Sequence, residues 1–462
     1  MPIITFDRFE IGIDLRKGRA VADSNRLRAA TNAYITTGWA VQKRPGFPLL
    51  IRLPVGTQGL FGWNNQAHVF TAGPVFTPDT PVIAVHSIPH PLSAVALSAM
   101  HYVGVFNGFL YVAAEYTNGD IYHHYLDGTL PTHIEDADNP RSRAVTIAAS
   151  KVFAVAGDTV RFSKTNDARD WSTVNDAGFL PTGLQADSSP QPLALGQQYG
   201  KLIVLHQDSV QRWTVDPDPA LMRFEEEIAN TGTIYPRTVV NVSGDVFFLS
   251  PFGFRSATLL QFNQNLAEID IGSPIDPLVR AALKDVSVAP HAVFFQALGQ
   301  YICAIGAQMF VYTYSRTAKV SAWSVYQAPG PIEHLAVLDD EVYYRVGDSV
   351  YQCDPEALDD GGQPIAVNVQ TAYLNFKEPA RLKHVKFIDA VIEGAADIEF
   401  LYDERDESRV THPMRVSGIT APGGLYPVDV LCTALSVRFK SESVEPFRLD
   451  AFSLHYDVLG EV

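Results

Sequence analysis

Apolar and polar residues alternate in short runs along this chain, and one arrangement of them returns several times. An apolar run is followed by a two-residue polar turn and then by a second run with Val near its start. The clearest copies are VFAVA-GD-TVRFS from Val152, LIVLH-QD-SVQRWTV from Leu202 and VYYRV-GD-SVYQCD from Val342. Short runs of this composition around a tight polar turn predict β-hairpins.

Looser copies extend the hairpin pattern over most of the chain. They begin at Leu110, Val246 and Tyr301, and a seventh begins at His68. The copies start roughly 40 to 55 residues apart, which is a period typical of β-propeller blades. A single blade cannot bury both of its faces, so blades repeat until they close into a ring. We therefore expect an all-β chain containing a β-propeller of about six or seven blades, some of them irregular.

The pattern divides the chain into three zones. Residues 1–50 hold no copy of the hairpin and predict an extended N-terminal arm. Residues 51–364 predict the propeller, in which Asp276–Leu283 is a short helix with Asp276 at its N-cap and Pro in its first turn. Gly and Pro in residues 359–364 predict a linker. Residues 365–462 alternate apolar and polar positions and predict a C-terminal β-sandwich.

Charge is distributed unevenly over the 462 residues. The net charge is −16, yet residues 1–52 carry nine Lys and Arg against four Asp and Glu. An acidic body argues against binding nucleic acid through its phosphates, and it is compatible with DNA sliding past or with solubility alone.

The cysteines and the absence of targeting segments bear on the compartment. Cys303, Cys353 and Cys432 give no disulfide framework and fit a reducing cytoplasm. Since no signal segment or membrane-spanning run is recognisable, we expect a soluble protein.

Several motifs that resemble functional sites have a structural explanation. Asp158, Asp208 and Asp348 share one turn position, where an Asp side chain accepts backbone N–H groups. The segment Ser163–Trp171 resembles the Asp-box turn of sialidase propellers, although its spacing is altered. In that family the turn stabilises a hairpin remote from catalysis. The motif therefore favours a propeller and says little about hydrolysis.

Acidic and imidazole clusters are the remaining candidates for chemistry. A glycosidase needs two carboxylates about 5 to 9.5 Å apart, and the runs Glu225–Glu227 and Asp403–Glu407 supply carboxylates, although such runs are usually solvated edges. His123 and His124 are neighbours on a predicted strand, with His133 downstream, so their side chains face opposite sides and are poorly placed to share a metal. No phosphate-binding loop, zinc helix or nucleophile elbow occurs. We expect no catalytic site, no metal and no cofactor.

The opening of the chain resembles a known family of virion proteins. Asn32–Trp39 followed by Lys43–Phe47 resembles the N-terminal motif of tail proteins from short-tailed bacteriophages. The middle of the chain is similar to the packaged-DNA-stabilisation, or tail hub and nozzle, proteins of the same group. This second comparison rests on Tyr199–Trp213, Ile228–Pro236, Val246–Ser250, Phe252–Phe254, Ile271–Ile275 and Tyr301–Trp323.

The resemblance implies a structural protein of the virion, assembled in the host cytoplasm and without enzymatic activity. Six copies would form a homohexameric tube below the portal and adaptor rings. The tube would extend the DNA channel, retain packaged DNA and carry a tail needle, spikes or fibres, while DNA passes without sequence-specific binding. The alternatives are a β-propeller glycan hydrolase or lectin acting on host polysaccharide, and a cellular propeller scaffold.

The basic residues of the predicted arm are the candidate partner-binding site. We expect them to contact a neighbouring subunit or the adaptor ring, and the alternative is an exposed, solvated segment. They are Arg16, Lys17, Arg19, Arg26, Arg28, Lys43 and Arg44.

Overall fold

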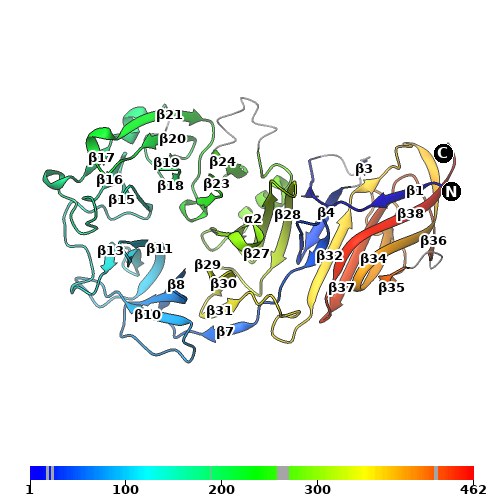
Figure 1. The fold of residues 1–462 in the computed structure, drawn as a ribbon, viewed down its shortest axis with the longest axis horizontal. Helices are drawn as coiled ribbons and strands as arrows, with labels where there is room; N and C mark the ends of the chain where they lie inside the picture. The colour runs from blue at the N-terminus through cyan, green and yellow to red at the C-terminus, as the bar shows by residue number, and fades with distance from the viewer. Residues whose placement is uncertain (17–19, 22–24, 188, 258–269, 421–424, 462) are drawn as a thin grey trace.

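The protein has two parts that lie side by side, a β-propeller and a β-sandwich (Figure 1). The computed structural model describes residues 1–16, 20, 21, 25–187, 189–257, 270–420 and 425–461. Both chain termini lie at the end of the sandwich that is remote from the propeller (Figure 1). The predicted all-β class, with a propeller and a sandwich, is confirmed by the strand pairing.

Within the described residues, seven groups of strands form the blades of the propeller. Six of these blades are separate small sheets, and the sixth blade in chain order is one end of a 15-stranded sheet that continues into the sandwich. Strands are given from the inner to the outer strand of each blade. The first blade consists of β8 (Thr57–Trp63), β9 (Gln66–Thr71) and β10 (Ile83–Ser87), and the second of β11 (Leu97–Phe106), β12 (Phe109–Tyr116) and β13 (Ile121–Leu126). The third consists of β14 (Val145–Ala148), β15 (Lys151–Ala156), β16 (Thr159–Phe162) and β17 (Gly178–Leu180), the fourth of β18 (Ala194–Gln198), β19 (Lys201–Leu205), β20 (Ser209–Thr214) and β21 (Arg223–Ala229), and the fifth of β22 (Val240–Val242), β23 (Asp245–Ser250) and β24 (Gly253–Ser256). The sixth and seventh are β25 (His291–Phe295), β26 (Gln300–Ile305), β27 (Gln308–Ser315) and β28 (Val320–Gln327); and β29 (His334–Leu338), β30 (Glu341–Val346), β31 (Ser349–Gln352) and β7 (Leu49–Arg52).

The repeated hairpins of the sequence form the middle of the blades. The copy at Val152 pairs β15 with β16, and the turn is made possible by Gly157 at φ 64°, a conformation that favours glycine. The copies at Leu202 and Val342 form β19–β20 and β30–β31, and the turn of the Val342 copy likewise has a glycine, Gly347, at φ 54°. The copy at His68 differs, because β9 is followed by a long loop and β10 then pairs with it in parallel. This blade is irregular, as expected for part of the ring.

The ring closes through contacts between inner strands and through one strand from the N-terminal region. Each inner strand contacts the next, and the last of them, β29, contacts the first, β8. The contact is close, since a Cβ added to Gly62 of β8 would lie 2.0 Å from the carbonyl oxygen of Val337. The seventh blade is completed by β7, which pairs antiparallel with β31 although about 300 residues separate them. Closure therefore joins the two ends of the propeller segment.

The sandwich is built around the long strand β34 (Arg381–Leu401). The first half of β34 lies between β36 and β38, and its second half lies between β35 and β37. The other strands of this part are β1 (Ile3–Phe6), β2 (Gly12–Ile13), β3 (Ala20–Val21), β4 (Arg26–Thr31), β5 (Ala33–Ile35), β6 (Val41–Lys43), β32 (Ile365–Thr371), β33 (Tyr373–Leu374), β35 (Met414–Ile419), β36 (Tyr426–Cys432), β37 (Ser436–Ser443) and β38 (Arg448–Glu461).

The N-terminal region differs from the extended arm that the sequence predicts. Strands β1 and β6 pair with β38, and β4 pairs with β32, so these N-terminal strands belong to the sandwich. Strands β2 and β4 also pair with β28, the outer strand of the sixth blade. The physical reason is that backbone N–H and C=O groups of isolated extended segments are satisfied by adding to the edges of existing sheets.

A single sheet path and a shared core join the two parts. The path runs from β25 through β28, β2, β4 and β32 into the sandwich. The largest apolar cluster contains Trp323 and Phe254 of the propeller together with Phe439 and Phe452 of the sandwich. Because the apolar core is continuous across the boundary, separating the two parts would expose it to water.

Short helices connect some of the strands. Helix α2 (Asp276–Lys284) confirms the predicted helix, but its N-cap is Ile275, and Asp276 is already helical. The 3-10 helices are η1 (Thr173–Asn175), η2 (Thr182–Gln185), η3 (Pro219–Leu221), η4 (Pro236–Thr238) and η5 (Gln296–Leu298).

Candidate functional site at the domain junction

The N-terminal motif lies at the boundary between the propeller and the sandwich. We call its central residues Asn32, Lys43, Arg44 and Gly46, with Asp360 of the linker, the domain junction. Asn32 has a left-handed backbone at φ 53°, which Asn tolerates better than most residues. Its side-chain amide donates to the carbonyl of Ala366 in the sandwich at 2.9 Å, and its Oδ1 accepts from the backbone N–H of Gln327 in the propeller at 2.9 Å.

Arg44 is the centre of the junction, and every N–H of its guanidinium has an acceptor. Two bonds of 2.8 and 2.6 Å go to the two carboxylate oxygens of Asp360. The others go to Oδ1 of Asn32 at 3.0 Å and to the carbonyls of Pro45 at 2.9 Å and Gln327 at 3.4 Å. The side chain is 2% exposed. Arg44 therefore binds the propeller, the linker and the N-terminal segment of its own chain at once.

Lys43 is also buried, and it contacts the sandwich. Its Nζ donates to the carbonyls of Ser443 at 2.6 Å and Glu445 at 3.1 Å. Burial, and then the neighbouring Arg44, lower the pKa of Lys43. The prediction that Lys43 and Arg44 bind a partner is corrected by this burial, because both cations are already bound inside the chain.

The Pro-Gly-Phe end of the motif fits tightly against the linker. A Cβ at Gly46 would lie 2.0 Å from the carbonyl oxygen of Asp359, so only glycine fits there. The ring of Phe47 lies under the Arg44 guanidinium at 4.3 Å and edge-on to Tyr344 of the seventh blade at 5.1 Å. The motif thus has a structural role that its sequence did not reveal.

The other basic residues of the predicted site lie farther along the sandwich. Arg16 and Arg26 both form ion pairs with the fully buried carboxylate of Asp14, at 2.8 Å for Arg16. Burial lowers the pKa of Arg26. Arg28 lies 3.9 Å from Glu407. Lys17 and Arg19 lie outside the described residues.

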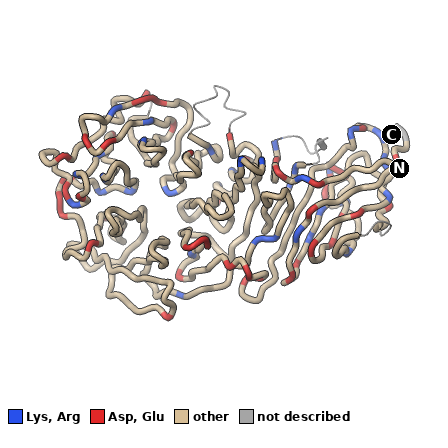
Figure 2. Tube along the Cα trace, in the orientation of Figure 1, with Lys and Arg blue, Asp and Glu red and all other residues tan. Residues whose placement is uncertain are grey.

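The five described residues of the predicted site therefore do not form one exposed basic surface. Arg16 keeps 42% of its side chain exposed, whereas the side chain of Arg26 is 13% exposed. Acidic and basic residues are interspersed along the propeller and the sandwich (Figure 2). Of the cations in the N-terminal sequence, Arg28 and Arg44 lie beside carboxylates that the fold brings from elsewhere in the chain, Glu407 and Asp360.

The Asp-box-like segment forms the turn between β16 and β17. Ser163 is buried, and its Oγ accepts from the N–H of Val152 at 3.0 Å and donates to the carbonyl of Lys164 at 3.1 Å. Trp171 is buried, and its indole N–H donates to the carbonyl of Ala168 at 3.0 Å. These bonds stabilise the third blade, in agreement with the structural role predicted for the segment.

The first acidic run lies on β21, the outer strand of its blade, and the second lies in the loop after β34; both contain carboxylates that pair with cations of the same chain. On β21, Glu225 pairs with Lys201, and Glu226 lies 3.3 Å from Arg212. After β34, Asp403 and Asp406 lie 3.5 and 3.7 Å from Arg409. In both runs, cations that lie beside the carboxylates hold them in surface ion pairs.

The neighbouring imidazoles of the second blade face opposite sides of β13, as the alternation of strand residues requires. His123 is hydrogen bonded to Tyr111 Oη at 2.7 Å and to the carbonyl of Ser142 at 2.9 Å. His124 is hydrogen bonded to Tyr116 Oη at 2.8 Å. Across the described part of the chain, no group of three potential metal-binding side chains is brought together.

One arrangement that the sequence analysis missed resembles a catalytic triad. Ser93 Oγ lies 2.9 Å from His90 Nδ1, and His90 Nε2 lies 3.0 Å from a carboxylate oxygen of Asp120. However, the backbone N–H groups of Leu92 and Ser93 also donate to His90 Nδ1, at 3.1 and 3.0 Å. The lone pair that would take the serine proton is already used, so the geometry is that of a capped turn.

Comparisons with known proteins find no matching family and only low similarity to solved structures. No family model matches the sequence, and no curated protein matches it. Solved structures with partial similarity include a chain of the mitotic checkpoint complex, with a TM-score of 0.38 and 9% identity over 76% of this chain and 94% of that chain. Another is the WD40 domain of Neurospora crassa Pan2, with a TM-score of 0.36 and 10% identity over 70% of this chain and 89% of that domain.

Scores this low carry no argument about function, so the class rests on strand pairing. The chain is an all-β protein in which a seven-bladed propeller, counted over the described residues, is continuous with a β-sandwich. Among the same residues, no helix has the length and apolar character needed to cross a bilayer.

Proposed function

We propose that this chain is a structural tail protein of a short-tailed bacteriophage, the hub or nozzle of the tail. Six copies form a tube below the portal and adaptor rings. The tube extends the DNA channel, helps to retain packaged DNA, and carries the needle, spikes or fibres. The chain is assembled in the host cytoplasm and becomes part of the virion.

The observation that carries this proposal is the position of the motif shared with tail proteins. Asn32 is hydrogen bonded to the sandwich and to the sixth blade, Lys43 to the sandwich, and Arg44 to the sixth blade and to the linker. A tube wall that surrounds tightly packed DNA needs subunits whose parts do not move against each other. A motif that makes the subunit one rigid body suits this role.

The net charge supports the same role. A chain with a net charge of −16 repels DNA phosphate, so DNA in a channel lined by several copies experiences little attraction to the wall. Screening shortens the range of this repulsion to about 8 Å at physiological ionic strength. The effect therefore acts where DNA approaches the wall and keeps friction low during ejection.

The contact with a neighbouring subunit or the adaptor is assigned to the part of the N-terminal segment that is not buried. Arg16, with 42% of its side chain exposed, is the described residue that fits this role best. Lys17 and Arg19 remain part of the proposed site. Replacing these three residues by Glu should block docking onto adaptor-loaded capsids, whereas Lys164→Glu on the propeller should not, and normal docking of the triple variant would refute the assignment.

The test of the proposed function is electron microscopy of the full chain, alone and mixed with its adaptor ring. We expect six-fold tubes, and we expect mass spectrometry to detect the chain in purified virions. A chain that stays monomeric under assembly conditions would count against the proposal. Release of sugars from host polysaccharide, abolished by substituting one carboxylate, would instead favour the glycan hydrolase.

A further inference from the structure

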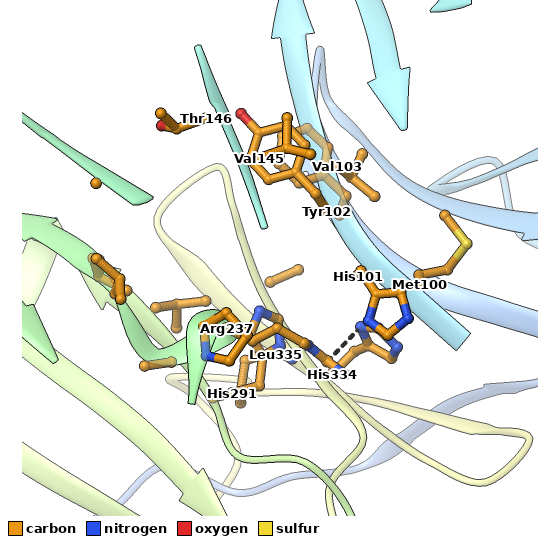
Figure 3. Close-up of a pocket in the computed structure, with 18 of the residues that line it drawn as sticks. Met100, His101, Tyr102, Val103, Val145, Thr146, Arg237, His291, His334 and Leu335 are labelled. Atoms are coloured by element: carbon orange, nitrogen blue, oxygen red, sulfur yellow. Dashed lines mark hydrogen bonds between the residues drawn. The ribbon is translucent and has the colours of Figure 1, made fainter. Parts of the chain in front are cut away.

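The propeller has a central channel that the proposed tail function does not use. It is a cavity of about 600 Å³, and residues of all seven inner strands line it. A second cavity of about 330 Å³ adjoins it, and His101, Arg143 and Arg237 line both. The charged and imidazole groups of the channel come from different blades, so only the closed ring brings them together (Figure 3).

Arg237, in η4, presents a cation to the channel without a carboxylate partner. Its Nη2 donates to the backbone carbonyl of Glu333 and to Nδ1 of His334, at 3.0 Å for the imidazole. No described carboxylate forms an ion pair with its guanidinium, and no other polar contact engages its Nε or Nη1. Burial lowers the pKa of Arg237 to about 10, although Glu333 opposes this effect. A desolvated cation of this kind favours an anion beside it.

Two histidines beside Arg237 add hydrogen-bond donors. Nδ1 of His334 accepts from Arg237, and Nδ1 of His291 accepts from the backbone N–H of Leu335 at 2.8 Å. Because these partners only donate, each imidazole must carry its proton on Nε2. Burial, and then Arg237, lower the pKa of both histidines well below the ordinary value, so both rings are neutral.

Both Nε2–H groups are open to the channel. Neither has a hydrogen-bond partner in the described part of the chain, and neither belongs to its fully buried, unpartnered atoms. The two rings lie 5.6 Å apart and nearly perpendicular, beside Arg237 (Figure 3). Nε and Nη1 of Arg237 and the two imidazole Nε2–H groups therefore form a group of donors without an acceptor in the described part of the chain, and a ligand in the channel can supply one.

The other charges around the channel are already balanced. Arg143 and His101 share the carboxylate of Glu115, at 3.1 and 2.6 Å. The half-buried carboxylate of Glu333 lies 3.8 Å from the buried Arg345. A ligand with one negative charge would neutralise Arg237, whereas a dianion would leave a surplus near Glu115 and Glu333.

We propose that the central channel of the propeller binds a small monocarboxylate. Its two oxygens accept hydrogen bonds from the guanidinium of Arg237 and from the Nε2–H groups of His291 and His334. The binding is reversible and makes or breaks no covalent bond. It is independent of the tail function, because it needs only the closed ring of one chain.

The test uses the full chain and follows its thermal unfolding while sodium acetate replaces sodium chloride at constant ionic strength and neutral pH. A ligand that binds only the folded state raises the unfolding midpoint in a saturable way. We expect this for the wild type with acetate, and a smaller rise with inorganic phosphate. In Arg237→Gln, the apparent affinity for acetate should fall roughly tenfold or more, as expected for the loss of a charge-assisted bond.

The matched control is Arg280→Gln, which removes an exposed arginine from α2 and should leave the response to acetate unchanged. If Arg237→Gln does not fold, calorimetric titration of the wild type with acetate and the folded variant Arg237→Lys provide the second measurement. Arg237→Lys should bind acetate with intermediate affinity. The absence of saturable binding to the wild type, stronger binding of phosphate than of acetate, or wild-type affinity in Arg237→Gln would each overturn the proposal.

Discussion

Replacing Arg44 by Ala should loosen the junction between the propeller and the sandwich. The substitution removes five hydrogen bonds, two of them to the carboxylate of Asp360. Breaking a buried ion pair by removing one partner costs about 3–5 kcal/mol. The side chain of Asp360 is 32% exposed and can regain water, so we expect about 3 kcal/mol. Loss of the guanidinium from the face of Phe47 adds about 0.5–1 kcal/mol.

The assay is urea denaturation followed by circular dichroism, combined with limited proteolysis. The Arg44→Ala variant should unfold at lower urea and should be cut faster within residues 359–364, because Asp360 no longer holds the linker. Arg44→Lys should recover less than half of the loss, since an ammonium group cannot reproduce the planar set of five donors.

The control for this experiment is Arg161→Ala in the third blade. Arg161 also pairs with an aspartate, Asp138, at 2.9 Å, but 32% of the arginine and 48% of the aspartate side chain are exposed. Such surface pairs contribute at most about 1 kcal/mol. If Arg44→Ala lost no more stability than Arg161→Ala and its linker were cut at the wild-type rate, the interpretation of Arg44 as the centre of the junction would be refuted.

Three further predictions concern the propeller. Gly62→Ala should cost about 1–3 kcal/mol in urea denaturation, because the new Cβ would lie 2.0 Å from the carbonyl oxygen of Val337; an unchanged midpoint would contradict the close approach of the first and last blades. Acidification should destabilise the fold, because burial lowers the pKa of His123 to about 4 and of His124 to about 3. On acidification the unfolded state binds protons before the folded state does, so the free energy of unfolding is unaffected by these histidines above about pH 6.5 and falls as the pH drops through 4. For His123 the expected loss is about 3 kcal/mol. A urea midpoint that does not vary over this range would argue against the prediction. Burial raises the pKa of Cys303, so its thiol should react with a disulfide reagent only after unfolding, and rapid labelling of the native protein would contradict its burial.

The sequence predicted the blades well because their information is local. A hairpin such as β15–β16 is determined by adjacent apolar runs and a Gly-Asp turn, all within twelve residues. The first blade was harder, because the second strand of the hairpin expected from His68 is replaced by β10, which pairs in parallel after a loop. Parallel pairing leaves no turn signal in the sequence.

The arrangement of the N-terminal segment could not be predicted from local pattern. Strand β4 pairs with β32, more than 300 residues later, and a short alternating segment looks the same whether it pairs or not. The ion-pair partners of the basic residues could not be predicted from local pattern either. Arg44 and Lys43 resemble an exposed basic patch in the sequence, but Asp360 lies 316 residues from Arg44 and becomes its partner only in the folded chain.

The path of the N-terminal segment couples the separation of the sandwich from the propeller to the opening of the propeller ring. The chain begins in the sandwich with β1, passes through the junction at Arg44, and then closes the propeller as β7. A force that pulls the sandwich away therefore acts on the same segment that completes the seventh blade. Because β7 pairs with β31 along its length, this load is spread over backbone hydrogen bonds rather than concentrated on one loop. In the proposed tube, a subunit connected in this way would transmit strain between neighbours without opening its own ring.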